Sequence, residues 1–364
     1  MHQLNDVELG FILKDILKDR NVTDVMIWDG EIWVSDINKG HFKYDYQYYE
    51  DKHKEELMNV LSVLPRQIAI RMQVGYNDSQ PILDGEGLFG ELGQLRFNCI
   101  HENLTSSQLP AIAIRRSEHS LRINRKALLA NNFVAPEFFP LIKILVESGC
   151  NIMISGQTGS GKTELLRYIC RFIPQQQAII TIEDTLEAYL KDIYPDKNVL
   201  SLKSNDIVNA SDLLKPCLRQ NPDWICISET RGAEVVHLLE AVSTGHKLIS
   251  TIHAESAKSI PSRMLEMSNG VVNNNNMYQQ IFNHIDIGIY ISYYNDSSGS
   301  HRQLTEVTEF YLDNNFGCHC NYLYKFDYVK GQPSFGKIVS EKIKQKIKEK
   351  KVDVSSIKGV FLNG

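Results

Sequence analysis

The segment over residues 156–163 constrains this chain more than any other feature. It reads Gly-Gln-Thr-Gly-Ser-Gly-Lys-Thr and matches the pattern G-x-x-x-x-G-K-[ST] in full. A short apolar run over 150–155 precedes it, and apolar residues at helical spacing follow it until Pro174. A Gly-rich turn that binds nothing is the alternative. The strand, the Lys-Thr pair and the helix together instead predict a nucleotide site.

Each residue of this phosphate loop is a candidate nucleotide contact. Glycines let the backbone turn tightly around phosphate, with N–H groups pointing inward at a helix N-terminus. We expect Lys162 to reach the terminal phosphates of ATP and the Thr163 hydroxyl to ligate Mg²⁺. The predicted nucleotide contacts are Gly156, Gln157, Thr158, Gly159, Ser160, Gly161, Lys162 and Thr163.

Composition narrows the class of protein. The 364 residues suffice for two or more domains, and 43% hydrophobic and 23% charged residues are ordinary for a soluble globular protein. A net charge of −5 lacks the basic excess of a dedicated nucleic-acid binder, so no stable nucleic-acid binding is expected. No apolar run reaches about 18 residues, and the N-terminus does not resemble a signal peptide. The seven cysteines lack paired spacing apart from Cys318 and Cys320, which predicts a reduced, cytoplasmic protein without zinc.

Hydrophobic periodicity divides the chain into four parts. Residues 1–125 predict a smaller α+β N-terminal domain with mostly antiparallel strands. Residues 126–140 have weaker periodicity and predict a linker. Residues 141–300 alternate strand and helix and predict an α/β domain with a mainly parallel sheet. Residues 301–364 predict further strands and a basic tail.

Local signals in the N-terminal domain predict several elements. Apolar stripes predict helices over 1–20 and 50–64, the second ending before Pro65. Asp-Gly dipeptides at 29–30 and 84–85 predict turns, and the first lies between two strand-like runs, as in a hairpin.

Four apolar runs in 141–300 each end in a group suited to phosphate chemistry. The first leads into the phosphate loop, the second into Glu183 and Asp184, the third into Glu229 and the fourth into His253. In open α/β sheets, ligands bind beyond the carboxyl ends of the strands. We therefore expect these groups to meet at one edge of one sheet.

Hydrolysis of a phosphoanhydride requires one carboxylate that orients water, and often another that holds Mg²⁺. Glu183 and Glu229 are the candidates for the water, and Asp184 and Glu229 are the candidates for the metal. The alternatives are a helix-capping turn at Asp184 and a structural ion pair between Glu229 and Arg231.

Two histidines lie at opposite ends of the fourth run. His253, at its carboxyl end, is suited to sense the γ-phosphate by hydrogen bonding. His246, at the other end, is more suited to contact a neighbouring element.

Four motifs in order resemble those of the secretion ATPase family of type II and type IV secretion systems. They are GQTGSGKT, TIEDTLE, LRQNPDWICISETRGAE and STGHKLISTIHAES, similar to the family's Walker A motif, Asp box, Walker B motif and His box. The resemblance extends over about residues 20–270. The sequence departs from the family at Ser228, where Gly is usual, and at Lys247 and Leu248, which follow His246 without the usual Gly. A compact N-terminal domain without a tetracysteine insert favours the type IV secretion and tight-adherence branch.

The resemblance implies a RecA-like P-loop domain, ATP and Mg²⁺ as cofactors, and a homo-hexamer. Such a ring powers type IV secretion, conjugation or pilus assembly as a peripheral protein on the cytoplasmic face of the inner membrane. Its implied partners are inner-membrane secretion or pilus assembly proteins. Arg96, Arg115 and Arg116 match N-terminal arginines that reach the nucleotide, with surface arginines as the alternative.

Two other functions stay open. One is a nucleotide-gated scaffold with negligible turnover. The other is a nucleic-acid motor that uses the basic run 341–351, for which a solvated helix, a membrane or nucleic-acid contact and a flexible tail are the alternatives.

Overall fold

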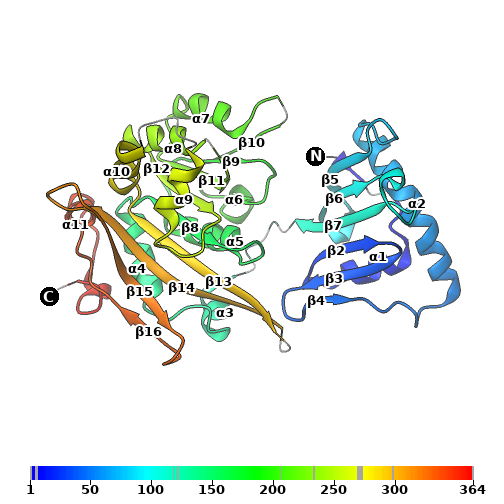
Figure 1. Ribbon diagram of the computed structural model, residues 1–364, viewed down its shortest axis with the longest axis horizontal. Helices are drawn as coiled ribbons and strands as arrows, with labels where there is room; N and C mark the ends of the chain where they lie inside the picture. The colour runs from blue at the N-terminus through cyan, green and yellow to red at the C-terminus, as the bar shows by residue number, and fades with distance from the viewer. Residues whose placement is uncertain are drawn as a thin grey trace. The chain divides into compact units, whose positions relative to one another are not determined.

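The computed structural model shows two compact units (Figure 1). It describes residues 2–4, 7–117, 119, 121, 123–205, 207–232, 234–268, 274–296 and 299–362.

Unit 1, within its described residues, is a seven-stranded sheet with two helices packed on one face (Figure 1). The strand order is β1-β5-β6-β7-β2-β3-β4; β1 pairs with β5 in parallel, and the other five pairs are antiparallel. The elements are β1 (His2–Gln3), α1 (Gly10–Lys18), β2 (Val22–Trp28), β3 (Glu31–Asp36), β4 (Gly40–Lys43), α2 (Asp51–Met72), β5 (Ile82–Leu88), β6 (Gln94–Ile100) and β7 (Ala111–Ser117).

The predicted hairpin at 29–30 is confirmed. Asp29 and Gly30 both have positive φ, 54° and 78°, and they join the antiparallel strands β2 and β3. The predicted helices differ in extent, because α1 is shorter than 1–20 and α2 continues through Pro65 to Met72. Pro65 lies inside α2, where its ring is buried on the same helix as the core residues Leu61 and Leu64.

The predicted turn at 84–85 is wrong, since both residues lie inside β5. Gly85 pairs with Phe97 of β6. A Cβ on Gly85 would lie 2.5 Å from Sδ of Met72 and 3.2 Å from Cγ2 of Ile68. Glycine at this position therefore lets α2 approach the strand closely, and it does not mark a turn.

Unit 2, within its described residues, is built on a nine-stranded sheet with the order β10-β9-β11-β12-β8-β13-β14-β15-β16. The strands from β10 to β13 pair in parallel, and β14, β15 and β16 pair antiparallel. The strands are β8 (Ile152–Gly156), β9 (Ile179–Glu183), β10 (Val199–Lys203), β11 (Trp224–Thr230), β12 (Lys247–Ile252), β13 (Ile287–Asp296), β14 (Gly299–Leu312), β15 (Cys318–Asp327) and β16 (Gln332–Phe335).

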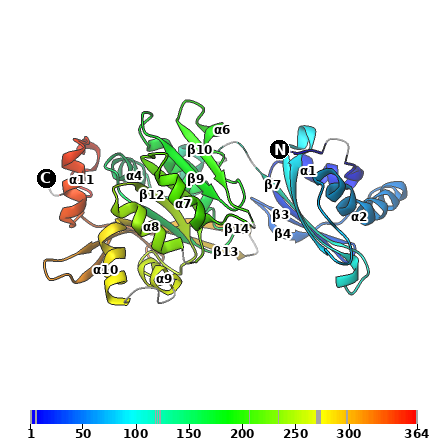
Figure 2. The ribbon, with the colours of Figure 1, turned by 90° about the horizontal axis from the view of Figure 1, so that it is seen from above.

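Helices cover both faces of this sheet (Figure 2). On β8, Ile152 and Ile154 face the core under α4, α5 and α11, whereas Met153 faces the core under α7 to α10. Because both faces are buried, the parallel strands read as continuous apolar runs. The helices are α3 (Arg125–Ala130), α4 (Phe138–Glu147), α5 (Lys162–Ile169), α6 (Leu190–Ile193), α7 (Ala210–Leu218), α8 (Glu234–Ser243), α9 (Ile260–Met267), α10 (Asn274–His284) and α11 (Glu341–Glu349). This architecture is the α/β fold with a mainly parallel sheet that the sequence predicts.

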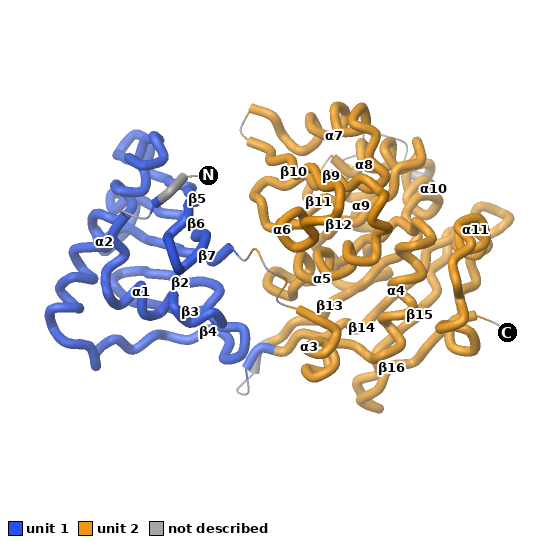
Figure 3. Tube along the Cα trace, turned by 180° about the vertical axis from the view of Figure 1, so that it is seen from behind, with its two compact units in different colours: residues 1–118, 295–300 blue, residues 119–294, 301–364 orange. Residues whose placement is uncertain are grey.

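The unit boundaries differ from the predicted domain boundaries (Figure 3). Unit 1 comprises residues 1–118 and 295–300, and unit 2 comprises 119–294 and 301–364. Within the predicted linker, α3 forms, and Phe133 and Val134 enter the core of unit 2 because their side chains are apolar. The C-terminal strands and α11 also belong to unit 2.

Candidate nucleotide site

The phosphate loop connects the carboxyl end of β8 to the first turn of α5. Gly156, Gly159 and Gly161 all have positive φ, 154°, 79° and 93°. A Cβ on Gly156 would lie 2.6 Å from the carbonyl oxygen of Ile291, so this position requires glycine. The motif therefore forms the tight strand-to-helix turn that its sequence predicts.

Lys162 and Ser160 provide the polar groups of this loop. The Lys162 ammonium donates to the carbonyl oxygens of Gly156 and Gln157, both at 3.0 Å. Burial lowers the pKa of Lys162, although the charge of Glu229 opposes this shift. Among the described residues, no group pairs with the buried hydroxyl of Ser160. A phosphate oxygen fits here, since it would supply the missing partner of Ser160 and a counter-charge for Lys162.

The other predicted loop residues lie where the motif requires. Gln157 and Thr158 form the exposed part of the loop, and Thr163 is half-buried in the first turn of α5. Among the described residues, no three His, Cys, Asp or Glu side chains converge as a metal site. The Thr163 hydroxyl would be one ligand of a Mg²⁺ ion that enters with the phosphates of a nucleotide.

Glu229 projects from an irregular stretch of β11. The register of β11 against β12 shifts between Ile227 and Thr230, so β11 contains one extra residue at this point. Hydroxyl groups of β12 support the irregularity: Ser250 Oγ donates to the carbonyl of Ile227 at 3.0 Å, and Thr251 Oγ1 donates to that of Ser228 at 2.5 Å. Ser228, a departure from the family pattern, thus lies within this bulge.

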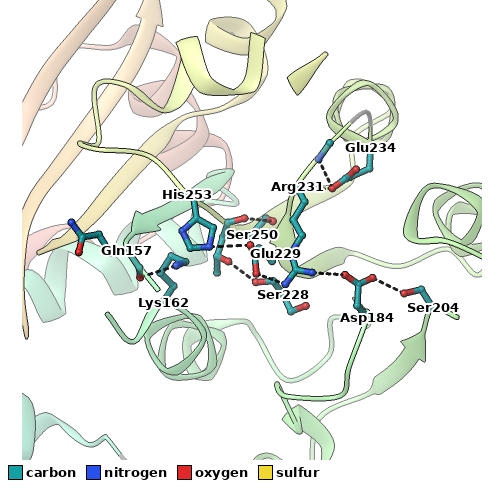
Figure 4. Close-up of polar contacts among 12 residues, drawn as sticks. Gln157, Lys162, Asp184, Ser204, Ser228, Glu229, Arg231, Glu234, Ser250 and His253 are labelled. Atoms are coloured by element: carbon teal, nitrogen blue, oxygen red, sulfur yellow. Dashed lines mark hydrogen bonds and ion pairs between the residues drawn. The ribbon is translucent and has the colours of Figure 1, made fainter. Parts of the chain in front are cut away.

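The Glu229 carboxylate contacts two side chains, Arg231 and His253 (Figure 4). Arg231 Nη2 lies 2.7 Å from Oε2, and His253 Nε2 lies 3.0 Å from Oε1. Burial alone would raise the pKa of Glu229, but the hydrogen bond and charge of Arg231, with the charges of His253 and Lys162, lower it below its ordinary value. Glu229 is therefore ionised at neutral pH. The structure thus brings Glu229 and His253 together, and His246 instead contacts the carbonyl of Pro222.

Asp184 lies on the far side of Arg231 from Lys162 (Figure 4). Arg231 Nη1 is 3.3 Å from Asp184 Oδ2, and the Ser204 hydroxyl donates to Oδ1 at 2.6 Å. Arg231 therefore bridges Asp184 and Glu229. This arrangement favours a role for Asp184 in positioning Arg231 over the predicted metal contact.

Glu183 is fully buried at the end of β9. Its Oε2 accepts the backbone N–H groups of Glu187 and Ala188, each at 2.8 Å, and its Oε1 accepts the Thr181 hydroxyl at 2.9 Å. Burial raises the pKa of Glu183, although these hydrogen bonds partly offset the shift. The carboxylate thus closes the turn that carries Asp184, and this placement argues against its predicted contact with water.

The three predicted N-terminal arginines lie on two faces of the unit 1 sheet. Arg96 and Arg115 are cross-strand neighbours on β6 and β7, and Arg115 Nε binds Asp24 Oδ1 at 2.6 Å. Arg116 points to the opposite face, where its buried guanidinium donates to the carbonyls of Leu17, Val22 and Leu92. This placement gives Arg116 a structural role and argues against its predicted contact with the nucleotide.

Sequence reasoning missed the hydroxyl groups that support the Glu229 bulge and one arginine beside the phosphate loop. Ser250 and Thr251 are polar residues inside an otherwise apolar strand, and this was the available signal. Arg302 donates from Nε to the carbonyl of Gly159 at 2.8 Å. Its position in a C-terminal region without motifs gave no such signal.

Comparisons with known proteins identify the relatives of this chain. The model of the family described as "Type II/IV secretion system protein" matches residues 98–287. The conjugal transfer protein TrbB of Rhizobium radiobacter is 31% identical over 256 residues, which cover 68% of this chain and 74% of TrbB. A protein of Bacillus anthracis without a described function is 28% identical and covers 94% of this chain and 76% of its own length.

A solved structure shares the fold. The ATPase DotB of Legionella pneumophila superposes with a TM-score of 0.61 at 19% identity, covering 87% of this chain and 85% of DotB.

Among the residues that the structure describes, no helix has the length and apolar character needed to cross a bilayer. The extent of the family match, with the phosphate loop and the four strand ends in place, shows that this chain belongs to the type II/type IV secretion ATPase family.

Proposed function

We propose that this chain is a hexameric, Mg²⁺-dependent ATPase that powers type IV secretion or conjugation. Hydrolysis would drive motion between unit 1 and unit 2, and the ring would act at the inner face of the cytoplasmic membrane with inner-membrane secretion proteins. The similarity to the conjugal transfer protein TrbB supports this system over pilus assembly.

The observation that carries the proposal is the position of the Glu229 carboxylate. It is ionised, it ends a strand of the same sheet edge as the phosphate loop, and Arg231 and His253 fix both of its oxygens. A carboxylate held in this way can orient water and accept its proton. A purely structural ion pair would not need a third group from the end of a separate strand.

The groups around the phosphate loop would have different roles in phosphoryl transfer. Lys162, the loop N–H groups and the Ser160 hydroxyl would bind the phosphates, and Mg²⁺ beside Thr163 would neutralise charge on the β- and γ-phosphate oxygens. Glu229 would orient a water molecule for attack on the γ-phosphorus while the bond to the bridging oxygen breaks. His253 would couple the loss of the γ-phosphate to the position of Glu229, since His253 Nε2 contacts Glu229 Oε1 directly.

Two variants test this assignment. In Lys162→Ala, nucleotide binding and phosphate release are both expected to be lost, because the buried cation of the loop is removed. In Glu229→Gln, binding is expected to persist while phosphate release falls by about 10²–10⁴-fold, the usual contribution of a general base. Phosphate release and binding of a fluorescent nucleotide are the measurements. Wild-type turnover in Lys162→Ala would exclude this site as the source of activity.

A nucleotide-gated scaffold is the second candidate. Phosphate release by the wild type at about 0.1–10 s⁻¹ would exclude it, because these are ordinary enzyme rates. Sedimentation of the chain with and without ATP tests the hexamer. A species of one or two chains at micromolar concentration, in the presence of ATP, would contradict the proposed ring.

A nucleic-acid motor is less favoured by the structure. Lys342 and Lys346 of the basic run both bind the buried carboxylate of Asp286, so they are already paired within unit 2. Salt-dependent DNA binding by the full chain would reopen this function.

A further inference from the structure

The phosphate loop has a second neighbour on the side of β8 away from Glu229. In the sheet, β12 and β11 lie on one side of β8, and β13 lies on the other. Ile291 of β13 is in register with Gly156, the first residue of the loop. Tyr293 follows two residues later, on the face shared by Ile289 and Ile291, which is the face that carries α5. The Tyr293 ring therefore lies beside the phosphate loop.

Tyr293 and Arg302 form one stack against this loop. The guanidinium carbon of Arg302 lies 4.9 Å from the centroid of the Tyr293 ring. Arg302 Nε donates to the carbonyl of Gly159 at 2.8 Å, and a Cβ on Gly159 would lie 3.6 Å from Cε1 of Tyr293. Both side chains are half-buried. The loop, the ring and the guanidinium are thus held in contact.

The direction of a bound nucleotide follows from the order of the strands. The groups suited to the terminal phosphate, Glu229 and His253, come from β11 and β12. A nucleotide whose terminal phosphate meets these groups must extend its nucleoside toward the opposite side of β8. That side is occupied by β13, with Tyr293 at its carboxyl end.

We propose that Arg302, backed by Tyr293, is the surface on which the base of the nucleotide stacks. The proposal rests on the proposed function, because it assigns the nucleoside end of the same site. A guanidinium is planar and weakly hydrated, and nucleic-acid bases stack on such planes. The hydrogen bond to Gly159 fixes this plane relative to the phosphates, so base and phosphates can bind together.

The stack of Tyr293 and Arg302 also predicts how far the site discriminates between different bases. Every base has a π-face, so stacking on a guanidinium does not read the edge of the base. Arg302 and Tyr293 therefore contribute affinity for nucleotides over phosphate chains that lack a base. Stacking of one base contributes about 5- to 150-fold in affinity, from values of about 1–3 kcal/mol.

The test compares ATP with inorganic tripolyphosphate, which has the phosphates but no base. Dissociation constants of both, with Mg²⁺, are measured by competition with a fluorescent nucleotide on the full chain. The variants are Arg302→Lys, which keeps the charge without the plane, and Tyr293→Ala, which removes the backing ring. Tyr294→Ala is the matched control, because the exposed Tyr294 is the next residue of β13 and stacks on His301.

We expect Arg302→Lys and Tyr293→Ala to weaken ATP by about 5- to 150-fold and to leave tripolyphosphate within about twofold of the wild type. Tyr294→Ala should change neither ligand. Equal losses for ATP and tripolyphosphate would overturn the proposal, since the stack would then only support the phosphate loop. Wild-type affinity for ATP in both variants would overturn it as well. Failure of the wild type to bind ATP would instead contradict the proposed function.

Discussion

Glu183 and Glu229 end neighbouring strands of one sheet, yet their carboxylates have opposite surroundings. Glu183 accepts two backbone N–H groups and a hydroxyl in a fully buried turn. Glu229 is partly exposed and is held between the guanidinium of Arg231 and the imidazole of His253. Burial with hydrogen-bond donors fixes a turn, whereas paired charges keep a carboxylate ionised beside a substrate. The sequence alone left the choice between them open, because both follow an apolar run.

Substitution by glutamine at Glu183 and at Glu229 separates a structural role in the turn from a role in activating water. In Glu183→Gln, one amide oxygen can accept both backbone N–H groups, and the amide nitrogen can donate to the Thr181 hydroxyl. We therefore expect Glu183→Gln to keep the melting temperature and turnover near those of the wild type. In Glu183→Ala, two buried N–H groups lose their acceptor, and the unfolding free energy is expected to fall by about 1–3 kcal/mol for each of them.

Melting temperature and steady-state phosphate release are the measurements, with Glu229→Gln as the reference. Loss of turnover in a stable Glu183→Gln variant would transfer the water-activating role to Glu183.

At the scale of elements, α11 is anchored to the end of α10 and to the buried carboxylate of Asp286. Lys342 of α11 donates to the carbonyls of Phe282 and Asn283, at 3.1 and 3.0 Å, near the C-terminus of α10. A cation at this end of a helix is favourable, because the last carbonyls carry partial negative charge. Lys346 binds the fully buried Asp286 at 2.5 Å, and Ile343 and Ile347 enter the core. The basic run over 341–351 is therefore an integrated helix and not a flexible tail.

The ion pairs of Asp286 predict how this anchor responds to pH. Burial alone would raise the pKa of Asp286, but the charges of Lys342 and Lys346 outweigh it and lower the pKa below 3.8. A carboxyl whose pKa is lowered by folding stabilises the fold above its unfolded pKa. This stabilisation is lost as the pH falls through the lower pKa of the folded state. It is fully present at neutral pH.

We expect Asp286→Asn to lower the unfolding free energy of unit 2 by about 3–5 kcal/mol at pH 7, because two lysines lose their buried partner. The difference from the wild type should shrink as the pH falls below about 4. Melting curves of both proteins over a pH series provide the measurement. The exposed Lys348 of the same helix serves as control, with Lys348→Ala expected to change little at any pH. A difference that stays constant to low pH would show that the charge of Asp286 is not the cause.

An element could be predicted from the sequence where its own segment contains a clear pattern of apolar and motif residues. Strands β8, β9, β11 and β12 were predictable because each is a buried apolar run that leads into a motif residue, such as Glu229 or His253. Strand β10 was missed because most of its side chains are exposed and no motif follows it. The turn expected at Gly85 was wrong because the glycine is needed for packing against Met72, which belongs to a separate element, α2. The bulge at Ser228 and the stack of Arg302 depend on contacts between strands, and no pattern within one strand reports such contacts.

At the scale of the whole molecule, the groups of the phosphate site described above all belong to unit 2, and the predicted arginines belong to unit 1. On unit 1, cross-strand register forms a row of four charged residues, in which two arginines lie between two carboxylates. The row lies on the sheet face away from α1 and α2, and it runs through Glu86, Arg96, Arg115 and Asp24. Arg116, on the other face, ties the last turn of α1 to the sheet. The three arginines therefore allow a test of whether unit 1 takes part in hydrolysis.

If unit 1 completes the site, Arg96→Ala and Arg115→Ala should lower turnover with little change in melting temperature. An arginine that stabilises charge on the γ-phosphate contributes about 10³–10⁵-fold in rate, which sets the upper range of the loss. Arg116→Ala should instead lower the melting temperature, because three carbonyls, two of them in buried hydrogen bonds, lose their donor. Turnover and melting temperature are measured on the same preparations, so that a fold defect is separated from a kinetic one. Full turnover in both surface variants would limit hydrolysis to the groups of unit 2, and the motion between units would then need another trigger.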